Sequence, residues 1–271
     1  MNASSASPEA DVERRFSGLQ RLYGIVGASA IRNAHVAVIG IGGVGSWAAE
    51  ALARSGVGRI TLIDFDQVAE SNINRQIHAD STTVGKAKVL AMQERIALLN
   101  PDCVVKAIEE FATPDNWSLL ASITFDAVID ACDQQKTKTA LAAWALVQQK
   151  QFKKRAPLFI TCGAAGGKRR AEKVEIADLS ETTHDPLLSD LRYRLRRQHN
   201  ATRDKRIGIT CVFSKEAVAP PDPSCALEDP NSSLNCHGYG SVVSVTATFG
   251  LCAAGWVMDM FAAQASTPAQ R

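Results

Sequence analysis

No two cysteines stand at the CxxC spacing, although the sequence of 271 residues contains seven of them. Structural zinc ribbons are built from such pairs, so no zinc is expected. The odd number of cysteines also argues against a disulfide framework. The pattern indicates reduced thiols, as in a cytoplasmic protein.

The N-terminus lacks the basic region and apolar stretch of a secretory signal. Residues 1–13 mix alanine, serine, proline and acids, and we expect a flexible leader there. Residues 238–258 carry no charge and are long enough, as a helix, to cross a bilayer. Serine and threonine dilute this segment and no Lys/Arg cluster flanks it, so we expect a buried helix, with membrane association as the alternative.

The net charge is small, +2 at pH 7, and by itself does not indicate a nucleic-acid partner. An apolar content of 46% predicts a globular protein with a large core. No internal repeat or low-complexity tract is visible. We therefore expect a single domain over residues 14–271, with a nucleotide-binding core in residues 14–164 and C-terminal elaborations in residues 165–271.

Short β-branched runs alternate with helical patterns, which predicts a Rossmann-like, doubly wound α/β fold with a mainly parallel sheet. Apolar steps of three and four residues predict a helix over residues 84–99, and Asp185-Pro186 predicts a helix that begins there and ends near Gln198. The expected strands are short, apolar and bounded by turn residues: 35–40, 59–64, 103–109, 125–130, 157–162, 173–177 and 208–213.

A glycine-rich loop follows the first expected strand and opens a helix at residues 46–54. Glycines let the main chain approach phosphate closely, and the free N–H groups of the following helix attract negative charge. Asp64, at the end of the next strand, is placed to accept hydrogen bonds from ribose hydroxyls. The sequence therefore predicts a nucleotide site that includes Gly40, Gly42, Gly43, Gly45 and Asp64.

Acids, amides and an arginine follow the ribose position closely: Asp66, Asn72, Arg75 and Gln76. A nicotinamide dehydrogenase rarely needs that array. An enzyme that handles a triphosphate with magnesium needs cationic donors and oxygen ligands. The pattern favours ATP and Mg²⁺ as cofactors over a dehydrogenase.

Over residues 15–164 the chain resembles the ubiquitin-activating-like adenylating enzymes, the ThiF, MoeB and HesA proteins. The motifs that carry the resemblance are the glycine loop and residues 64–66, 71–76, 85–89 and 130–133. The resemblance implies a catalytic set of Arg75, Lys88 and Asp130, in which Arg75 and Lys88 bind the phosphates and Asp130 binds magnesium. It also implies that Asp64 holds the ribose, that Asp66 and Asn72 line the same pocket and that Gln76 braces it.

Simpler interpretations exist for several of these residues. Lys86 and Lys88 are also explained as solvated helix charges. Asp133 is also explained as the N-cap of a helix over residues 134–149. The family uses an N-terminal arginine at the phosphates, for which Arg15 and Arg21 are the candidates.

The second half resembles the tRNA threonylcarbamoyladenosine dehydratase branch of these enzymes. The matching stretches are residues 23–24, 39–47, 74–78, 113–116, 185–187, 211–214 and 245–250. This resemblance implies ATP-dependent adenylation of the threonylcarbamoyl carboxylate in tRNA, then ring closure with release of AMP. It further implies a homodimer.

The alternative is adenylation of the C-terminal glycine of a ubiquitin-like sulfur carrier, with a sulfur-transfer protein partner. Enzymes of that branch usually carry two CxxC pairs, which this chain lacks, and a cysteine nucleophile, for which Cys211 and Cys225 are the nearest candidates. Cys211 stands in a strand-like run, where a buried structural thiol is expected. Cys225, Cys236 and His237 match no standard zinc spacing.

A dense basic stretch near the C-terminal third predicts contact with tRNA, and a solvated helix face is the alternative. Tyr193 and His199 within it are candidates to stack on bases. A second cluster, residues 168–170, is expected to extend the patch. The only acidic residue between positions 192 and 206 is Asp204. The candidate tRNA-binding residues are Arg192, Arg194, Arg196, Arg197, Arg203, Lys205 and Arg206.

Overall fold

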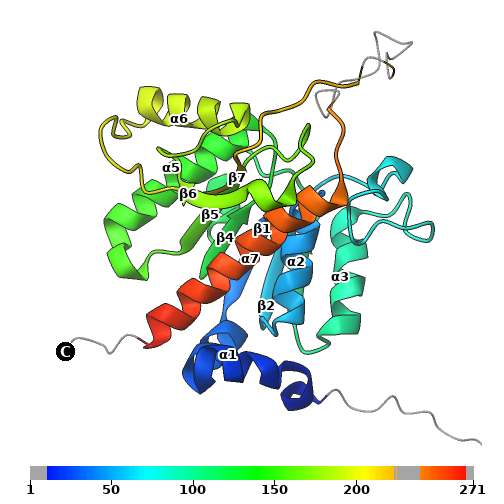
Figure 1. Cartoon of the computed structure of the whole chain (residues 1–271). Coiled ribbons are helices and arrows are strands. Elements are labelled where there is room, and N and C mark those ends of the chain that lie inside the picture. The colour runs from blue at the N-terminus through cyan, green and yellow to red at the C-terminus, as the bar shows by residue number, and fades with distance from the viewer. Residues whose placement is uncertain (1–10, 223, 225–238, 267–271) are drawn as a thin grey trace, which may run out of the picture.

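A computed structural model describes residues 11–222, 224 and 239–266, and within them seven strands form one sheet (Figure 1). The strand order is β3-β2-β1-β4-β5-β7-β6, and all neighbours are parallel except β6 and β7. The predicted doubly wound α/β fold is confirmed, and each strand lies within two residues of its expected position. The strands are β1 (His35–Ile39), β2 (Arg59–Ile63), β3 (Val104–Ile108), β4 (Ala127–Asp130), β5 (Leu158–Cys162), β6 (Val174–Asp178) and β7 (Thr210–Ser214).

Helices cover both faces of the sheet, because the strands are apolar on both sides. In β1, Val36 and Val38 belong to the core cluster shared with α2 (Gly45–Arg54), α3 (Lys88–Leu99) and α7 (Val243–Ser266). Ala37 and Ile39 point the other way, into the cluster shared with α4 (Trp117–Leu120), α5 (Gln135–Phe152) and α6 (Pro186–Gln198). The described residues also form short 3₁₀ turns at η1 (Glu70–Asn72), η2 (Lys153–Arg155) and η3 (Ala171–Lys173).

Helix α1 (Val12–Asn33) lies outside these two layers and packs against α7 (Figure 1). It bends at Gly24, whose φ of 71° interrupts the helix, and the Tyr23 hydroxyl donates to Asp259 Oδ1 at 2.8 Å. Because α1 begins at Val12, the leader expected over residues 1–13 is too long at its C-terminal end. Residues 1–10 lie outside the described part.

Helix α3 begins at Lys88, four residues later than expected. Residues 84–87 form a turn instead, in which Gly85 adopts a φ of 86°. A positive φ is incompatible with an α-helix, and Val84 is 43% exposed, so the apolar residue there belongs neither to the helix nor to the core.

Helix α7 is long and apolar enough to cross a membrane by length and composition, but 56% of its most apolar window is buried inside the protein. It packs against α1 and α2. Any side chain at Gly250 would collide with the Val44 carbonyl, so this glycine permits the close crossing of α7 over α2. The burial favours the expected core helix, which runs to Ser266 rather than to residue 258; residue 238 lies outside the described part.

Candidate active site

A cavity of about 670 Å³ opens beyond the carboxyl ends of β1 and β4, where the strand order reverses. Open α/β sheets bind ligands at such a switch point. The structure brings most of the predicted nucleotide residues to its wall: Gly40, Gly42, Gly43, Asp64, Asp66, Asn72, Arg75, Gln76 and Lys88. Gly45 and Asp130 do not line it.

The glycine loop joins β1 to α2 in very little space. Gly40 has a φ of 84°, and a side chain there would lie 3.0 Å from the Ala131 carbonyl. Any side chain at Gly45 would collide with the Gly40 carbonyl, so Gly45 allows the helix to approach the strand. No side chain caps the N-terminus of α2, whose helix dipole therefore favours an anion at the cavity.

Asp64 holds the glycine loop against the end of β2. Its Oδ2 accepts from the Ile41 N–H at 2.6 Å and its Oδ1 from the Asp66 N–H at 2.8 Å. Burial raises the pKa of Asp64, and the nearby Lys88 opposes that rise. A carboxylate that faces the cavity and is already oriented by backbone donors suits recognition of ribose hydroxyls.

The two neighbouring lysines occupy different environments. Lys88, at the start of α3, is 7% exposed, and its Nζ lies 2.8 Å from Asp66 Oδ2 at the cavity wall. Lys86 lies in the turn before α3 and pairs with Glu94 at the surface. The interpretation as a solvated helix charge is therefore wrong for Lys88, whereas Lys86 is a half-exposed, ion-paired charge that lies before the helix.

Arg75 and Gln76 follow η1. The Arg75 guanidinium donates to the Ser71 carbonyl at 2.7 Å and to Asn74 Oδ1 at 2.9 Å. Gln76 is 5% exposed and its Oε1 has no hydrogen-bond partner among the described residues; the same holds for Nε2 of Gln135, which also lines the cavity. Unpartnered buried polar atoms are rare in native proteins, so both fit a polar ligand in the cavity.

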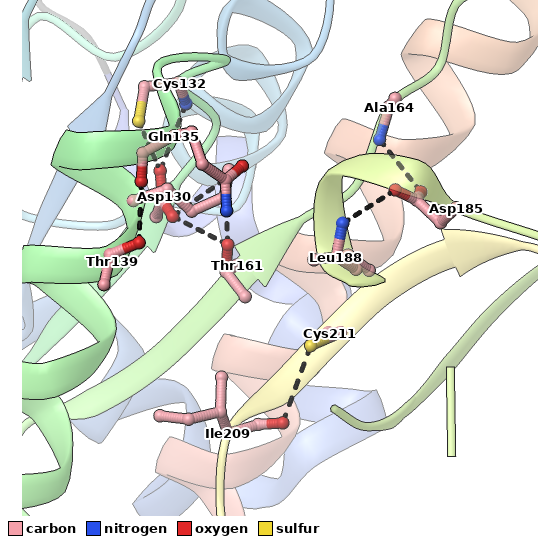
Figure 2. Close-up of polar contacts among 11 residues, drawn as sticks. Asp130, Cys132, Gln135, Thr139, Thr161, Ala164, Asp185, Leu188, Ile209 and Cys211 are labelled. Carbon is pink, nitrogen blue, oxygen red and sulfur yellow. Dashed lines mark hydrogen bonds and ion pairs between the residues drawn. The ribbon is translucent and has the colours of Figure 1, made fainter. Parts of the chain in front are cut away.

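Asp130 requires a correction, because it is fully buried in a polar cluster instead of facing the cavity (Figure 2). Its Oδ2 accepts from Lys138 Nζ at 2.8 Å and from Thr161 Oγ1 at 2.6 Å, and its Oδ1 accepts from the backbone N–H and thiol of Cys132. Both carboxylate oxygens are thus occupied by protein donors. The expectation that Asp130 binds magnesium is not compatible with these contacts.

Asp133 is the carboxylate that lines the cavity at this position. It is exposed and makes no hydrogen bond or ion pair within the described part of the chain. The helix-cap interpretation is wrong, because the N-cap of α5 is Gln134. No group of three or more His, Cys, Asp or Glu residues among those described is arranged to hold a metal ion.

Sequence reasoning missed the part of the wall that α6 and α7 contribute. Asp185 caps α6 as predicted, by accepting from Leu188 N–H at 3.0 Å, and its second oxygen accepts from the Ala164 N–H at 2.9 Å (Figure 2). That contact holds the start of α6 beside the loop after β5. The loop after β5 and α6 add Ala164, Gly166, Pro186, Leu187 and Asp190 to the wall, and the start of α7 with the residues before it adds Ser241 and Thr246. The helix-start signal at Asp185 was visible in the sequence, but its long-range contact was not.

Neither N-terminal arginine candidate lines the cavity. Arg15 Nη1 donates to the Leu99 carbonyl at 2.7 Å, at the end of α3 that lies away from the cavity. The Cys211 thiol is buried in β7, 3.6 Å from the Ile209 carbonyl, and burial raises its pKa well above the ordinary value (Figure 2). It is a structural thiol, as expected. Cys225, Cys236 and His237 lie outside the described residues.

The basic stretch after Pro186 divides into half-buried side chains with internal partners and exposed side chains. Arg192 donates to the Leu179 and Thr182 carbonyls, Arg194 pairs with Asp190, and Arg196 donates to the Thr202 and Arg203 carbonyls. The other four side chains are exposed: Arg197, Arg203, Lys205 and Arg206. One of them, Arg206, lies 3.9 Å from Glu181 Oε1.

Lys168 does not extend the basic patch. It is 2% exposed, and its Nζ donates to the carbonyls of His184, Ser214 and Glu216. Those bonds join the loops around β7, so the role of Lys168 is structural.

His78 gives the protein a predicted sensitivity to acid. Its ring is 2% exposed, neither nitrogen has a partner among the described residues, and burial, with Lys88 and Arg95, lowers its pKa to about 4. The unfolded chain takes up a proton near pH 6.5 and the folded chain near pH 4, so stability falls as the pH drops through that window. We expect a loss of about 3 kcal/mol between pH 7 and pH 4 from this group. Urea unfolding at several pH values should show a flatter profile for His78→Leu, and an unchanged profile would contradict this assignment.

Comparisons with known proteins agree with this geometry. The ThiF family model matches residues 16–270. The tRNA threonylcarbamoyladenosine dehydratase of Haemophilus influenzae is 42% identical over 91% of this chain and 93% of its own length. The crystal structure of the Escherichia coli tRNA N6-threonylcarbamoyladenosine dehydratase in complex with ATP superposes with a TM-score of 0.82 at 40% identity, over 94% of this chain and 96% of that one.

An adenylyltransferase of another kind matches less of the chain. The molybdopterin-synthase adenylyltransferase of Escherichia coli is 36% identical over 43% of this chain and 47% of its own length. The shared region is thus less than half of each protein, whereas the dehydratases match along nearly the whole chain. The chain belongs to the ThiF family, and two relatives that match over 91% and 93% of it are tRNA threonylcarbamoyladenosine dehydratases.

Proposed function

We propose that this protein is an ATP-dependent enzyme that adenylates the threonylcarbamoyl carboxylate of a modified adenosine in tRNA and closes it into a ring with loss of water. The observation that carries the proposal is similarity over nearly the whole length to dehydratases of that name, one of which was solved with ATP. The cavity supports it, because its wall combines a glycine loop, a carboxylate for the ribose and cationic donors for phosphates.

The reaction would proceed in two displacements. A carboxylate oxygen of the substrate attacks the α-phosphorus of ATP, and the bond to pyrophosphate breaks. A nucleophile of the same substrate then attacks the activated acyl carbon, and AMP leaves. Since neither step needs a protein nucleophile, the enzyme mainly positions the partners and neutralises charge.

The residues of the cavity would divide these tasks. The amides of the glycine loop and the N-terminus of α2 would face the phosphates, and Arg75 and Lys88 would supply positive charge to them. Asp64 would accept from the ribose, while Asn72 and Asp66 orient the surrounding turn through their contacts with Ala69 and Lys88. Gln76 would offer its unpartnered oxygen to the ligand.

Magnesium suits this cavity, because Asp133 provides an exposed oxygen ligand and Mg²⁺ usually combines one or two carboxylates with substrate phosphates. When bound it would neutralise charge on the phosphoryl groups. We expect Asp133→Asn to raise the magnesium concentration needed for half-maximal pyrophosphate exchange about tenfold or more. The melting temperature without nucleotide should stay within a degree or two, since this side chain makes no internal contact. An unchanged magnesium requirement would show that Asp133 does not bind the metal.

Mass spectrometry of tRNA nucleosides after incubation with protein and ATP tests the function. The modified adenosine should lose one water, with one AMP released for each ring formed. Release of AMP with a ubiquitin-like carrier protein, and none with tRNA, would instead support the sulfur-carrier alternative and its protein partner.

A homodimer in the cytoplasm is part of the same proposal. Helix α1 exposes three large apolar side chains near its bend, Leu22, Ile25 and Val26, which would be covered by a second copy. Light scattering of the purified chain should give twice the monomer mass of 29.0 kDa.

A further inference from the structure

A second hollow, of about 520 Å³, lies on α6 and the loop that follows it. Its wall consists of Ser189, Arg192, Tyr193, Arg196, Arg197 and Arg203. Four of these six side chains are arginines and none is acidic. A concave wall with charge of one sign concentrates the field and attracts a polyanion.

The four arginines differ in exposure and in their internal hydrogen bonds. Arg192 and Arg196 are half-buried and donate to backbone carbonyls, which fixes them in the wall of the hollow. Arg197 and Arg203 are exposed, and neither lies within ion-pair distance of a carboxylate among the described residues. All four keep their charge, and the side chains best placed to contact a ligand directly are the exposed Arg197 and Arg203.

Tyr193 adds an aromatic surface to this charge. Its side chain is 56% exposed, although a large apolar ring is usually covered. Arg197 holds the ring in place, because its Nη1 donates to the Tyr193 hydroxyl at 2.8 Å and its guanidinium carbon lies 5.9 Å from the ring centroid. A fixed, accessible ring beside free arginines suits a nucleobase with its phosphates, whereas an acidic peptide requires only the charges.

The hollow is adjacent to the active-site cavity along the same helix. Pro186, Leu187 and Asp190 line the cavity, whereas Ser189 and Tyr193 line the hollow. From Asp190 to Arg197 the helix advances about 10 Å. Neighbouring nucleotides of one strand can span that separation, so one RNA segment can reach both sites.

We infer that the hollow binds unpaired nucleotides of the substrate RNA that flank the adenosine in the active-site cavity. Tyr193 stacks on a base, and Arg197 and Arg203 contact phosphates. The inference rests on the proposed function, in which tRNA is the substrate.

Binding of modified tRNA to the full-length chain, measured by fluorescence anisotropy at several salt concentrations, tests the inference. Tyr193→Ala should weaken binding about tenfold, because stacking of one base contributes roughly 1–3 kcal/mol, while Tyr193→Phe keeps the ring and should stay within about twofold. Replacing Arg197 and Arg203 together by alanine should reduce the log–log salt slope by about 1.4, at about 0.7 for each phosphate contact of a single strand. The affinity for ATP should be unchanged in all three variants.

A control variant removes the same charge elsewhere. Arg59→Ala with Lys106→Ala changes two exposed cations on β2 and β3, at the opposite end of the sheet from β7 and β6, and should leave the salt slope as it is. Equal effects of the control and of the arginine pair would overturn the inference, as would normal affinity in Tyr193→Ala and in the arginine pair variant. If these variants lose affinity for an acidic carrier protein and not for RNA, the hollow serves a protein and the inference is again overturned. If the unaltered chain neither binds nor dehydrates tRNA, the proposed function itself fails.

Discussion

Asp130→Ala is expected to destabilise the protein by about 3–5 kcal/mol, because it leaves a buried ammonium group without its counter-ion. Asp130 and Lys138 are both fully buried, and their charged atoms lie 2.8 Å apart. Burial alone would lower the pKa of Lys138, but the Asp130 carboxylate outweighs it and the pKa is raised, so Lys138 stays charged. Urea unfolding monitored by circular dichroism should show the loss as a lower midpoint.

The matched control removes both charges. Asp130→Ala combined with Lys138→Met should recover most of the lost stability, because replacing a buried ion pair by apolar side chains is often nearly neutral. If Asp130→Ala unfolds at the same urea concentration as the unaltered protein and loses adenylation alone, the buried pair contributes little and a role for Asp130 in the reaction returns. Asp133→Asn is the comparison within the same loop, since it should affect the magnesium requirement and not the stability.

Lys88→Ala is expected to slow ATP–pyrophosphate exchange at least about a hundredfold, which is the usual effect of removing one positioned charge-stabilising donor. Lys88 is the buried cation at the cavity wall, and Asp66 holds its Nζ in place. Few water molecules can replace it there, because the side chain is 7% exposed. Exchange measured at saturating ATP would report the loss in the chemical step.

Lys86→Ala is the control for that variant, two positions away in the sequence. Its ammonium group pairs with Glu94 at the surface, and exposed pairs contribute little to stability. Exchange should therefore stay within about twofold of the unaltered enzyme. Equal losses in the two variants would contradict the distinction between the buried and the solvated lysine, and a melting temperature for each would show whether Lys88→Ala still folds.

The strands and the nucleotide loop were predictable because their signals are local. Val36 to Ile39 read as a buried strand from their own side chains, and Gly40 and Gly45 are required by the tight turn that they form. The start of α3 was misplaced, since an apolar residue such as Val84 looks the same in a turn as in a helix. Periodicity is read from residue types, which show neither that Val84 is exposed nor that Gly85 has a positive φ.

The sequence by itself determined the doubly wound fold, the phosphate loop and the second-strand aspartate, because each depends on residues that are neighbours in the chain. Tertiary structure alone decided what Asp130 does: Thr161 lies directly opposite it in the register of β4 and β5, and Lys138 reaches it from the first turns of α5. The tertiary structure also places α6 at the cavity, through the hydrogen bond from the Ala164 N–H to Asp185. Asp130 and Asp133 are both aspartates, so residue type cannot tell which of them faces a ligand. Their roles differ because Asp130 is buried inside the protein, whereas Asp133 lines the cavity.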